Sequence, residues 1–168
     1  MRQSLDGPHE HHRCGELMND DTSIAAELRR MADELFITTD LKDWTAARAL
    51  FVDGPIEVDM SSLAGGAAIQ ITADQLMDGF RAGLHAGKVS HHLATNYRVR
   101  IDGDRAELWA HGYAWNLVPS LPPGTGLWET WGTYRLTYRR GAEGWRLDGF
   151  RYFSKLTRGN EAVRTHTA

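Results

Sequence analysis

The segment from Ser90 to Trp115 holds three histidines beside strand-like, aromatic-rich sequence. His91 and His92 are adjacent, and His111 follows on the next predicted strand. A histidine ordinarily titrates at a pKa of about 6.5, so it can accept or release a proton near neutral pH. If these side chains line a pocket, one of them could act as a general base on a bound molecule. Which one does so depends on the elements that carry them.

Helical periodicity dominates the first half of the chain. An apolar stripe at steps of three and four residues predicts a helix that begins after the capping residues 20–22 and runs to about residue 39. A shorter helix is predicted over residues 43–54 and a strand over residues 56–59. A further helix is predicted from a capping-box pattern at Thr72 to about residue 87. The stripe of the first helix consists of Ile24, Leu28, Met31 and Leu35.

After residue 90 the apolar period changes to two, which is typical of strands. One hairpin is predicted from residues 91–101 and 105–118, which are joined by an Asp-Gly-Asp turn. A second hairpin is predicted from residues 127–140 and 145–154. Helices followed by a run of antiparallel strands indicate an α+β fold. We therefore expect a curved antiparallel sheet wrapped around the N-terminal helices, with a cavity between them.

The chain of 168 residues fits a single domain, and its 42% hydrophobic residues suffice for a globular core. The polar residues 1–19 are predicted to form a flexible N-terminal tail. Residues 20–157 are predicted to be one domain, and residues 158–168 a C-terminal tail.

The formal net charge of −3, without a run of Lys and Arg, argues against binding to nucleic acid or to an anionic membrane. A lone cysteine, Cys14, excludes an internal disulfide and a Cys-rich zinc site. No segment is apolar enough to span a membrane, and the N-terminus lacks the apolar core of a signal peptide, so a cytoplasmic location is predicted. Because no phosphate-binding glycine loop, nucleotide fingerprint or metal-ligand pattern is present, neither a cofactor nor a metal is expected.

Three short motifs resemble a known family: Asp40-Leu-Lys-Asp-Trp44, His92-Leu-Ala-Thr-Asn-Tyr-Arg98 and Gly144-Trp-Arg-Leu147. On these residues, the chain from about residue 24 to 156 resembles the SnoaL-like branch of the nuclear-transport-factor-2-like superfamily. Within that branch it is most similar to scytalone dehydratase and the hexachlorocyclohexane dehydrochlorinase. The resemblance implies that residues 20–157 form a SnoaL-like domain with a cone-shaped α+β fold.

In those enzymes an aspartate after the first helix pairs with a strand histidine at the bottom of the cavity, and the motif match carries these roles to Asp40 and His92. A carboxylate bonded to one ring nitrogen fixes the tautomer and stabilises the imidazolium formed when the other nitrogen takes a proton. Such a base could remove a proton beside a carbonyl or a leaving group. The sequence alone leaves a second interpretation open, in which Asp40 is a surface residue at the end of the helix.

Strict alternation along the first long strand conflicts with this role for His92. It places His91 on the apolar face, which would normally turn inward, and His92 on the polar face. We follow the motif spacing, because an apolar outer face is explained if it packs against another subunit, and we keep His91 as the alternative base. This choice predicts a homo-oligomer, with a trimer favoured and a dimer as the alternative. The apolar face also carries Leu93, Thr95, Tyr97, Val99 and Ile101.

The next strand offers further polar candidates. His111 is either a core or rim histidine bonded to the backbone, or a second catalytic group that orients the substrate or delivers a proton. An ungapped match puts Leu117, and not a histidine, where scytalone dehydratase has its second histidine, and the tyrosines that polarise a carbonyl there have no counterpart. Tyr113 or Tyr134 could instead stabilise an enolate-like oxygen.

Aromatic side chains are expected to line the pocket. Trp115, beside a proline-rich loop, is predicted at its mouth, and Phe51 and Phe80 are predicted on its helical side. This composition favours a small hydrophobic, ring-shaped ligand.

The predicted function is that of a cofactor-independent lyase, of the dehydratase type, or an isomerase, with His92 as base and Asp40 as its partner. One alternative is a non-catalytic small-molecule binding protein of the same fold, since one scaffold hosts many functions. The other is a structural subunit, like the small subunit of ring-hydroxylating oxygenases. The Asp40–His92 pair discriminates between them, because it is useful to a lyase and needless to a scaffold.

Overall fold

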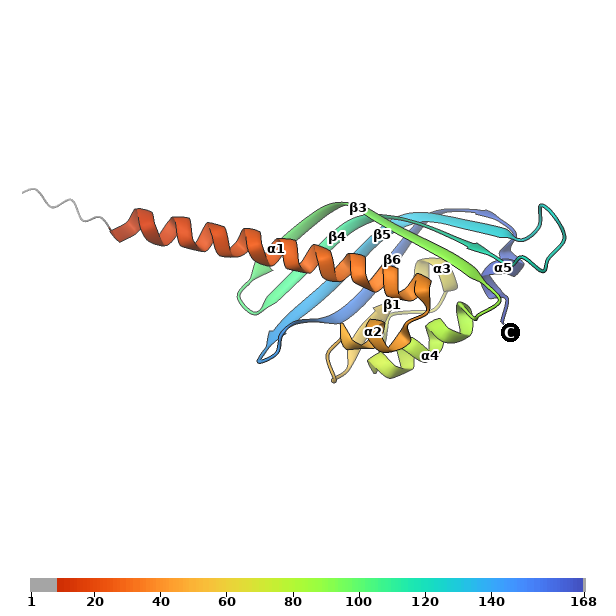
Figure 1. Ribbon diagram of the computed structural model, residues 1–168, viewed down its shortest axis with the longest axis horizontal. Helices are drawn as coiled ribbons and strands as arrows, with labels where there is room; N and C mark the ends of the chain where they lie inside the picture. The colour runs from red at the N-terminus through yellow and green to blue at the C-terminus, as the bar shows by residue number, and fades with distance from the viewer. Residues whose placement is uncertain (1–8, 168) are drawn as a thin grey trace, which may run out of the picture.

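A computed structural model describes residues 9–167 of the chain, and the side chains of residues 20–167 (Figure 1). It confirms an α+β fold in which helices precede the long strands of a curved, unclosed sheet. The elements in chain order are α1 (His9–Leu41), α2 (Trp44–Ala49), β1 (Ile56–Asp59), α3 (Ser61–Ala64), β2 (Ile69–Ile71), α4 (Ala73–Gly83), β3 (Val89–Asp102), β4 (Arg105–Leu117), β5 (Leu127–Gly141), β6 (Gly144–Gly159) and α5 (Glu161–Thr165).

The sheet has the strand order β2-β1-β6-β5-β4-β3. All neighbouring strands are antiparallel except β1 and β6, which run parallel. Figure 1 shows the four long strands β3–β6 arching beside α1, with α2 and α4 grouped near the C-terminal end of that helix. The two predicted hairpins, β3–β4 and β5–β6, are therefore both present.

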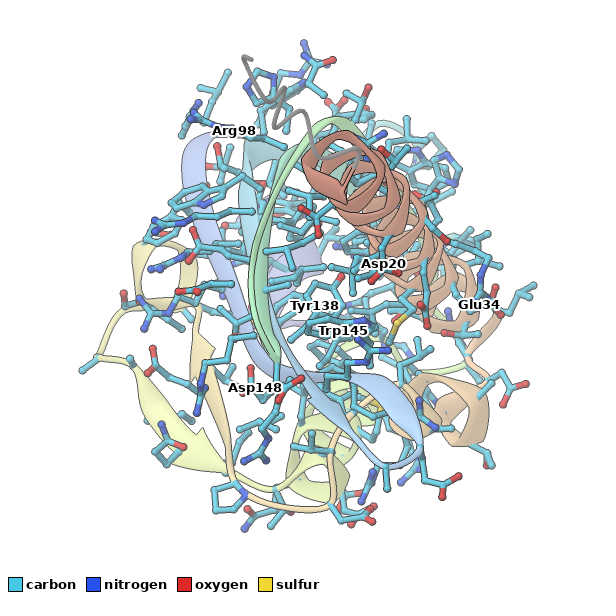
Figure 2. The ribbon with its side chains drawn as sticks, turned by 90° about the vertical axis from the view of Figure 1, so that its left-hand side faces the viewer. Asp20, Glu34, Arg98, Tyr138, Trp145 and Asp148 are labelled. Carbon is cyan, nitrogen blue, oxygen red and sulfur yellow. The ribbon has the colours of Figure 1, made fainter. Side chains whose placement is uncertain are left out.

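The core lies between α1 and the inner face of the sheet. Leu28 and Leu35 of α1 are buried against the inward side chains of β5 and β6. Figure 2 shows Tyr138 and Trp145 in this layer, and the Tyr138 hydroxyl donates to the Leu28 carbonyl over 3.1 Å. Burial of apolar surface contributes about 25 cal/mol per Å², so this layer is what fixes α1 on the sheet.

A β-bulge in β3 reverses the inside-outside pattern of that strand. The register with β4 shifts between Thr95 and Arg98, and Asn96 adopts a left-handed conformation with φ of 57°. Asparagine tolerates this conformation better than most residues. One extra residue in a strand moves every following side chain to the opposite face. Before the bulge Ser90, His92 and Ala94 are the less exposed residues, and after it Tyr97, Val99 and Ile101 are.

The prediction of a uniformly apolar outer face on β3 was therefore wrong. Tyr97, Val99 and Ile101 pack on the core, so His92 can face inward without a second subunit to cover them. Only the residues before the bulge, including Val89 and Leu93, expose apolar side chains on the outer face. The apolar outer face of β3 therefore no longer supports a homo-oligomer. The trimer or dimer stays a prediction.

The structure also revises both ends of the chain. Helix α1 begins at His9, well before the predicted start after residues 20–22, and residues 1–8 of the predicted tail lie outside the described residues. At the other end, the predicted tail over residues 158–168 instead completes β6 and forms α5. Its Val163 is fully buried against Val118 and Trp128, and this apolar contact holds the segment in place.

Candidate active site

The C-terminal end of α1 positions the carboxylate of Asp40. The Asp43 N–H donates to the Thr38 carbonyl over 2.9 Å, and the Lys42 N–H donates to the Thr39 carbonyl over 3.1 Å. These two bonds form a Schellman motif, with Lys42 at the left-handed position (φ of 59°) that glycine usually occupies. The chain turns sharply there, and Asp40 remains in the last helical turn. Asp43 caps α2, accepting from the Ala46 N–H over 3.0 Å.

Asp40 is bonded to His92 at two points. Its Oδ1 lies 2.7 Å from the ring Nδ1 of His92, and its Oδ2 accepts the backbone N–H of the same residue over 2.7 Å. The Ser90 hydroxyl donates to Oδ1 over 2.9 Å. Both side chains are largely buried, with 18% exposure for Asp40 and 16% for His92.

These donors keep Asp40 ionised. Burial alone would raise the pKa of the Asp40 carboxyl, and the negative end of the α1 dipole also disfavours a carboxylate there. The bonds from the His92 ring and backbone, the charge of that ring and the Ser90 hydroxyl outweigh the burial, and the pKa of Asp40 is lowered. A carboxylate held in this way can stabilise a positive charge on the imidazole.

The His92 side chain lies at the wall of a cavity. Because Nδ1 donates to Asp40, the neutral ring carries its lone pair on Nε2. The ring packs against Phe36 of α1, with a centroid separation of 6.0 Å and an interplanar angle of 15°. His92 lines the cavity, and the described residues provide no hydrogen-bond partner for Nε2. The free nitrogen is therefore available to a bound molecule.

His91, the alternative base, lies on the other face of β3. Its side chain is 48% exposed and is tilted against Trp115, with ring centroids 5.6 Å apart. Its Nδ1 is 3.8 Å from Asp40 Oδ2, beyond a hydrogen bond. The geometry therefore favours His92 over His91 as the base.

The cavity has a volume of about 630 Å³ and lies between the helices and the inner face of the sheet. Phe80 of α4 and Tyr134 of β5, both predicted to contact a ligand, line it. This volume is in the range of small-molecule sites. Its apolar lining includes Leu35, Phe36, Val58, Met60, Leu63, Ile71, Leu76, Leu84, Ala114, Trp128 and Phe150.

Tyr134 is a hydroxyl-bearing residue of the cavity wall. Its ring packs between Phe36 and Tyr152, with centroid distances of 4.5 and 4.8 Å. Burial, followed by the nearby Tyr152 and Asp40, raises the pKa of the Tyr134 phenol well above its usual value. Tyr134 therefore stays protonated and can act as a hydrogen-bond donor.

Four predicted site residues lie elsewhere. His111, Tyr113 and Trp115 are on the outer face of β4, and Phe51 is buried in the core, where it forms a β-bridge with Leu147. On the outer face the ring Nδ1 of His111 lies 3.2 Å from the side-chain amide of Asn96. The inner face of β4 carries small residues instead, because aromatic side chains there would fill the cavity. The expectation that these four residues contact substrate is corrected accordingly.

The cavity wall also includes polar residues that were not predicted to line it. Asn116 is buried on the inner face of β4, and Lys88 is fully buried just before β3. The Lys88 ammonium donates to the carbonyls of Gly83 (2.7 Å), His166 (3.0 Å) and Arg164 (3.4 Å). Lys88 thereby ties the C-terminal segment to the end of α4 beside the cavity. The inward phase of β4 was the only sequence signal that could have identified Asn116.

The comparisons with known proteins agree with this fold. A SnoaL-like domain is matched over residues 20–151, so the chain belongs to the SnoaL-like family. The solved structure of Kfla4162 from Kribbella flavida is 26% identical, with a TM-score of 0.77 over 83% of this chain and 95% of that one. None of the curated proteins compared with the chain matches it.

Two enzyme-named structures share the fold at lower identity. A candidate scytalone dehydratase from Novosphingobium aromaticivorans is 15% identical, with a TM-score of 0.71 over 84% of this chain and 91% of that one. A hexachlorocyclohexane dehydrochlorinase, LinA type 2, is 13% identical, with a TM-score of 0.69 over 83% and 90%. The resemblance drawn from the three motifs is thus confirmed at the level of family and fold. Within residues 9–167, no helix is long and apolar enough to cross a membrane.

Proposed function

We propose that the chain is a cofactor-independent lyase or isomerase that removes a proton from carbon in a small apolar cyclic molecule. The observation that carries this proposal is the Asp40–His92 pair, bonded over 2.7 Å at the wall of an apolar cavity. A buried carboxylate with an imidazole partner is costly to desolvate and serves no purpose in a plain container.

The proposed reaction begins with transfer of a substrate proton to Nε2 of His92. The imidazolium that forms is stabilised by the Asp40 carboxylate, which does not itself take the proton. The electron pair left on carbon is delocalised onto a substrate oxygen, and the Tyr134 hydroxyl donates a hydrogen bond to that oxygen.

Two outcomes follow from the same intermediate. In a lyase the electron pair forms a carbon–carbon double bond as a leaving group departs, and the imidazolium returns its proton to that group. In an isomerase the imidazolium returns the proton to another carbon of the substrate. The names dehydratase and dehydrochlorinase, borne by proteins of this fold, support the elimination.

The proposal can be tested without knowing the natural substrate. The probe is 2-tetralone, a bicyclic ketone with acidic C–H groups beside its carbonyl, incubated in D₂O and followed by NMR. We expect the wild-type protein to accelerate deuterium uptake, and His92→Ala and Asp40→Asn each to abolish the acceleration. His91→Ala is the matched control and should retain it, because His91 lies outside the cavity.

Acceleration that survives in both His92→Ala and Asp40→Asn would refute the proposed mechanism. Binding of 2-tetralone without any His92-dependent exchange would favour the alternative, a non-catalytic binding protein. Mass spectrometry of a co-purified ligand would then identify the molecule that fills the cavity.

A further inference from the structure

The amide of Asn116 is an unpaired polar group in the cavity wall. The side chain is only 7% exposed, and its Oδ1 is buried without a hydrogen-bond partner in the part of the chain described. Asn116 lines the same cavity as His92. A buried polar atom without a partner destabilises the fold, so a bound molecule that supplies the missing hydrogen bond would offset this cost.

The register of the sheet places this amide relative to the base. Asn116 pairs with Ser90 of β3, the residue whose hydroxyl binds Asp40. His92 pairs with Ala114, two residues earlier on β4. Diagonal neighbours on two paired antiparallel strands are separated by roughly 7–8 Å, so Asn116 and His92 lie about one ring system apart along the cavity wall.

The neighbouring polar groups do not occupy the amide. The Thr130 hydroxyl of β5 lies 2.9 Å from the Tyr152 hydroxyl and 3.2 Å from that of Ser154. The Lys88 ammonium uses its three donors on backbone carbonyls. Neither of these groups bonds to the Asn116 amide, so its Oδ1 keeps the capacity to accept a hydrogen bond from a ligand.

We propose that Asn116 forms a subsite for a hydroxyl group on the ring system of the substrate. This rests on the proposed function, because it takes the molecule in the cavity to be the substrate of His92. A hydroxyl can donate to Oδ1, the atom of this amide that has no partner. A carboxylate or an ether has no proton for Oδ1. The substrate class is therefore a neutral, hydroxylated, mainly apolar ring compound.

The test compares two probes that differ only in the hydroxyl proton, 2-naphthol and 2-methoxynaphthalene. Their affinities for the wild-type protein and its variants are measured by calorimetric titration. We expect wild type to prefer 2-naphthol by about tenfold, the worth of one hydrogen bond to a buried acceptor. Asn116→Leu should lose this preference. Thr130→Val is the matched control, a second polar wall residue made apolar, and should keep it.

The preference for 2-naphthol is measured from binding alone, so this test of the Asn116 subsite does not depend on catalysis by His92. His92→Ala should keep the preference for 2-naphthol even though it loses catalysed exchange. No preference in wild type, or an equal preference in wild type and Asn116→Leu, would overturn the subsite. If Asn116→Leu does not fold, the side-chain amide resonances of Asn116 in labelled wild-type protein decide: they should shift with 2-naphthol and stay in place with its methyl ether.

Discussion

The two faces of strand β4 differ in composition and in use. The outer face carries His111, Tyr113 and Trp115. Tyr113 stacks on Trp131 of β5, and Trp115 packs against His91 of β3. The inner face carries Ala110, Gly112, Ala114 and Asn116. The residue types that suggest chemistry are concentrated on the outer face, whereas the cavity is formed over the small residues of the inner face.

The same contrast separates the histidines. His111 lies next to the amide of Asn96 on the outer surface, while His92 has a buried carboxylate from α1 behind it and an apolar cavity in front. The surroundings of a histidine decide whether its imidazole can act as a catalytic base. A catalytic histidine needs a cavity that admits a substrate as well as a carboxylate partner.

Exchanging each histidine for glutamine tests whether only the inner one acts as a base. Loss of a general base typically lowers a rate by about 10²–10⁴-fold. We expect His92→Gln to reduce catalysed deuterium uptake by 2-tetralone by that factor, and His111→Gln to leave it within about twofold, because His111 does not reach the cavity. A large loss in His111→Gln, with an intact fold by circular dichroism, would show that the outer face takes part in the chemistry.

A second test concerns the small residues of the inner face. A Cβ on Gly112 would lie 2.3 Å from Cε2 of Tyr134, so Gly112→Ala must displace that ring. Overpacking of this kind costs about 1–3 kcal/mol of unfolding free energy, measurable by urea denaturation. Gly141→Ala is the control, because a Cβ there has no heavy atom within 4 Å. Equal stability of the two variants would mean that Tyr134 is not packed on β4 in this way.

The smallest effect is expected in the acid stability of the inner site. The folded-state pKa of Asp40 is lowered, so its contribution to stability is present above the ordinary aspartate pKa of 3.8 and is lost as the pH falls below that value. Thermal unfolding measured between pH 5 and about pH 3 should show a smaller loss of stability on acidification in Asp40→Asn than in the wild-type protein. Parallel curves for the two proteins would contradict the described bonding of Asp40.

Much of the fold follows from local sequence. The capping box at Thr72, with bonds of 2.9 and 3.2 Å to and from Gln75, opens α4 as predicted, and the hairpin turns fall where the turn residues stand. These features depend on near neighbours in the chain, so the sequence expresses them directly. The short helix α3 has no side-chain cap. Helix α5 has one, because Asn160 accepts from the Ala162 N–H over 3.0 Å, but its place in the fold depends on the burial of Val163 against distant residues.

The candidate site was predicted only in part. The family motifs indicated Asp40 and His92, and the structure brings their side chains together across 52 positions of sequence. The structure places His111, Tyr113 and Trp115 on the outer face of β4, outside the cavity, because polar and aromatic residue types do not identify the inner face of a strand. Residue types alone do not show which face of a strand lines a cavity.

The sequence by itself determined the helices, the hairpins and the α+β class, because helical and strand periods and turn chemistry are properties of neighbouring residues. Only the tertiary structure decided which faces of β3 and β4 look inward. That choice depends on a single bulge at Asn96 and on the volume between α1 and the sheet, and both are set by packing between segments far apart in the chain.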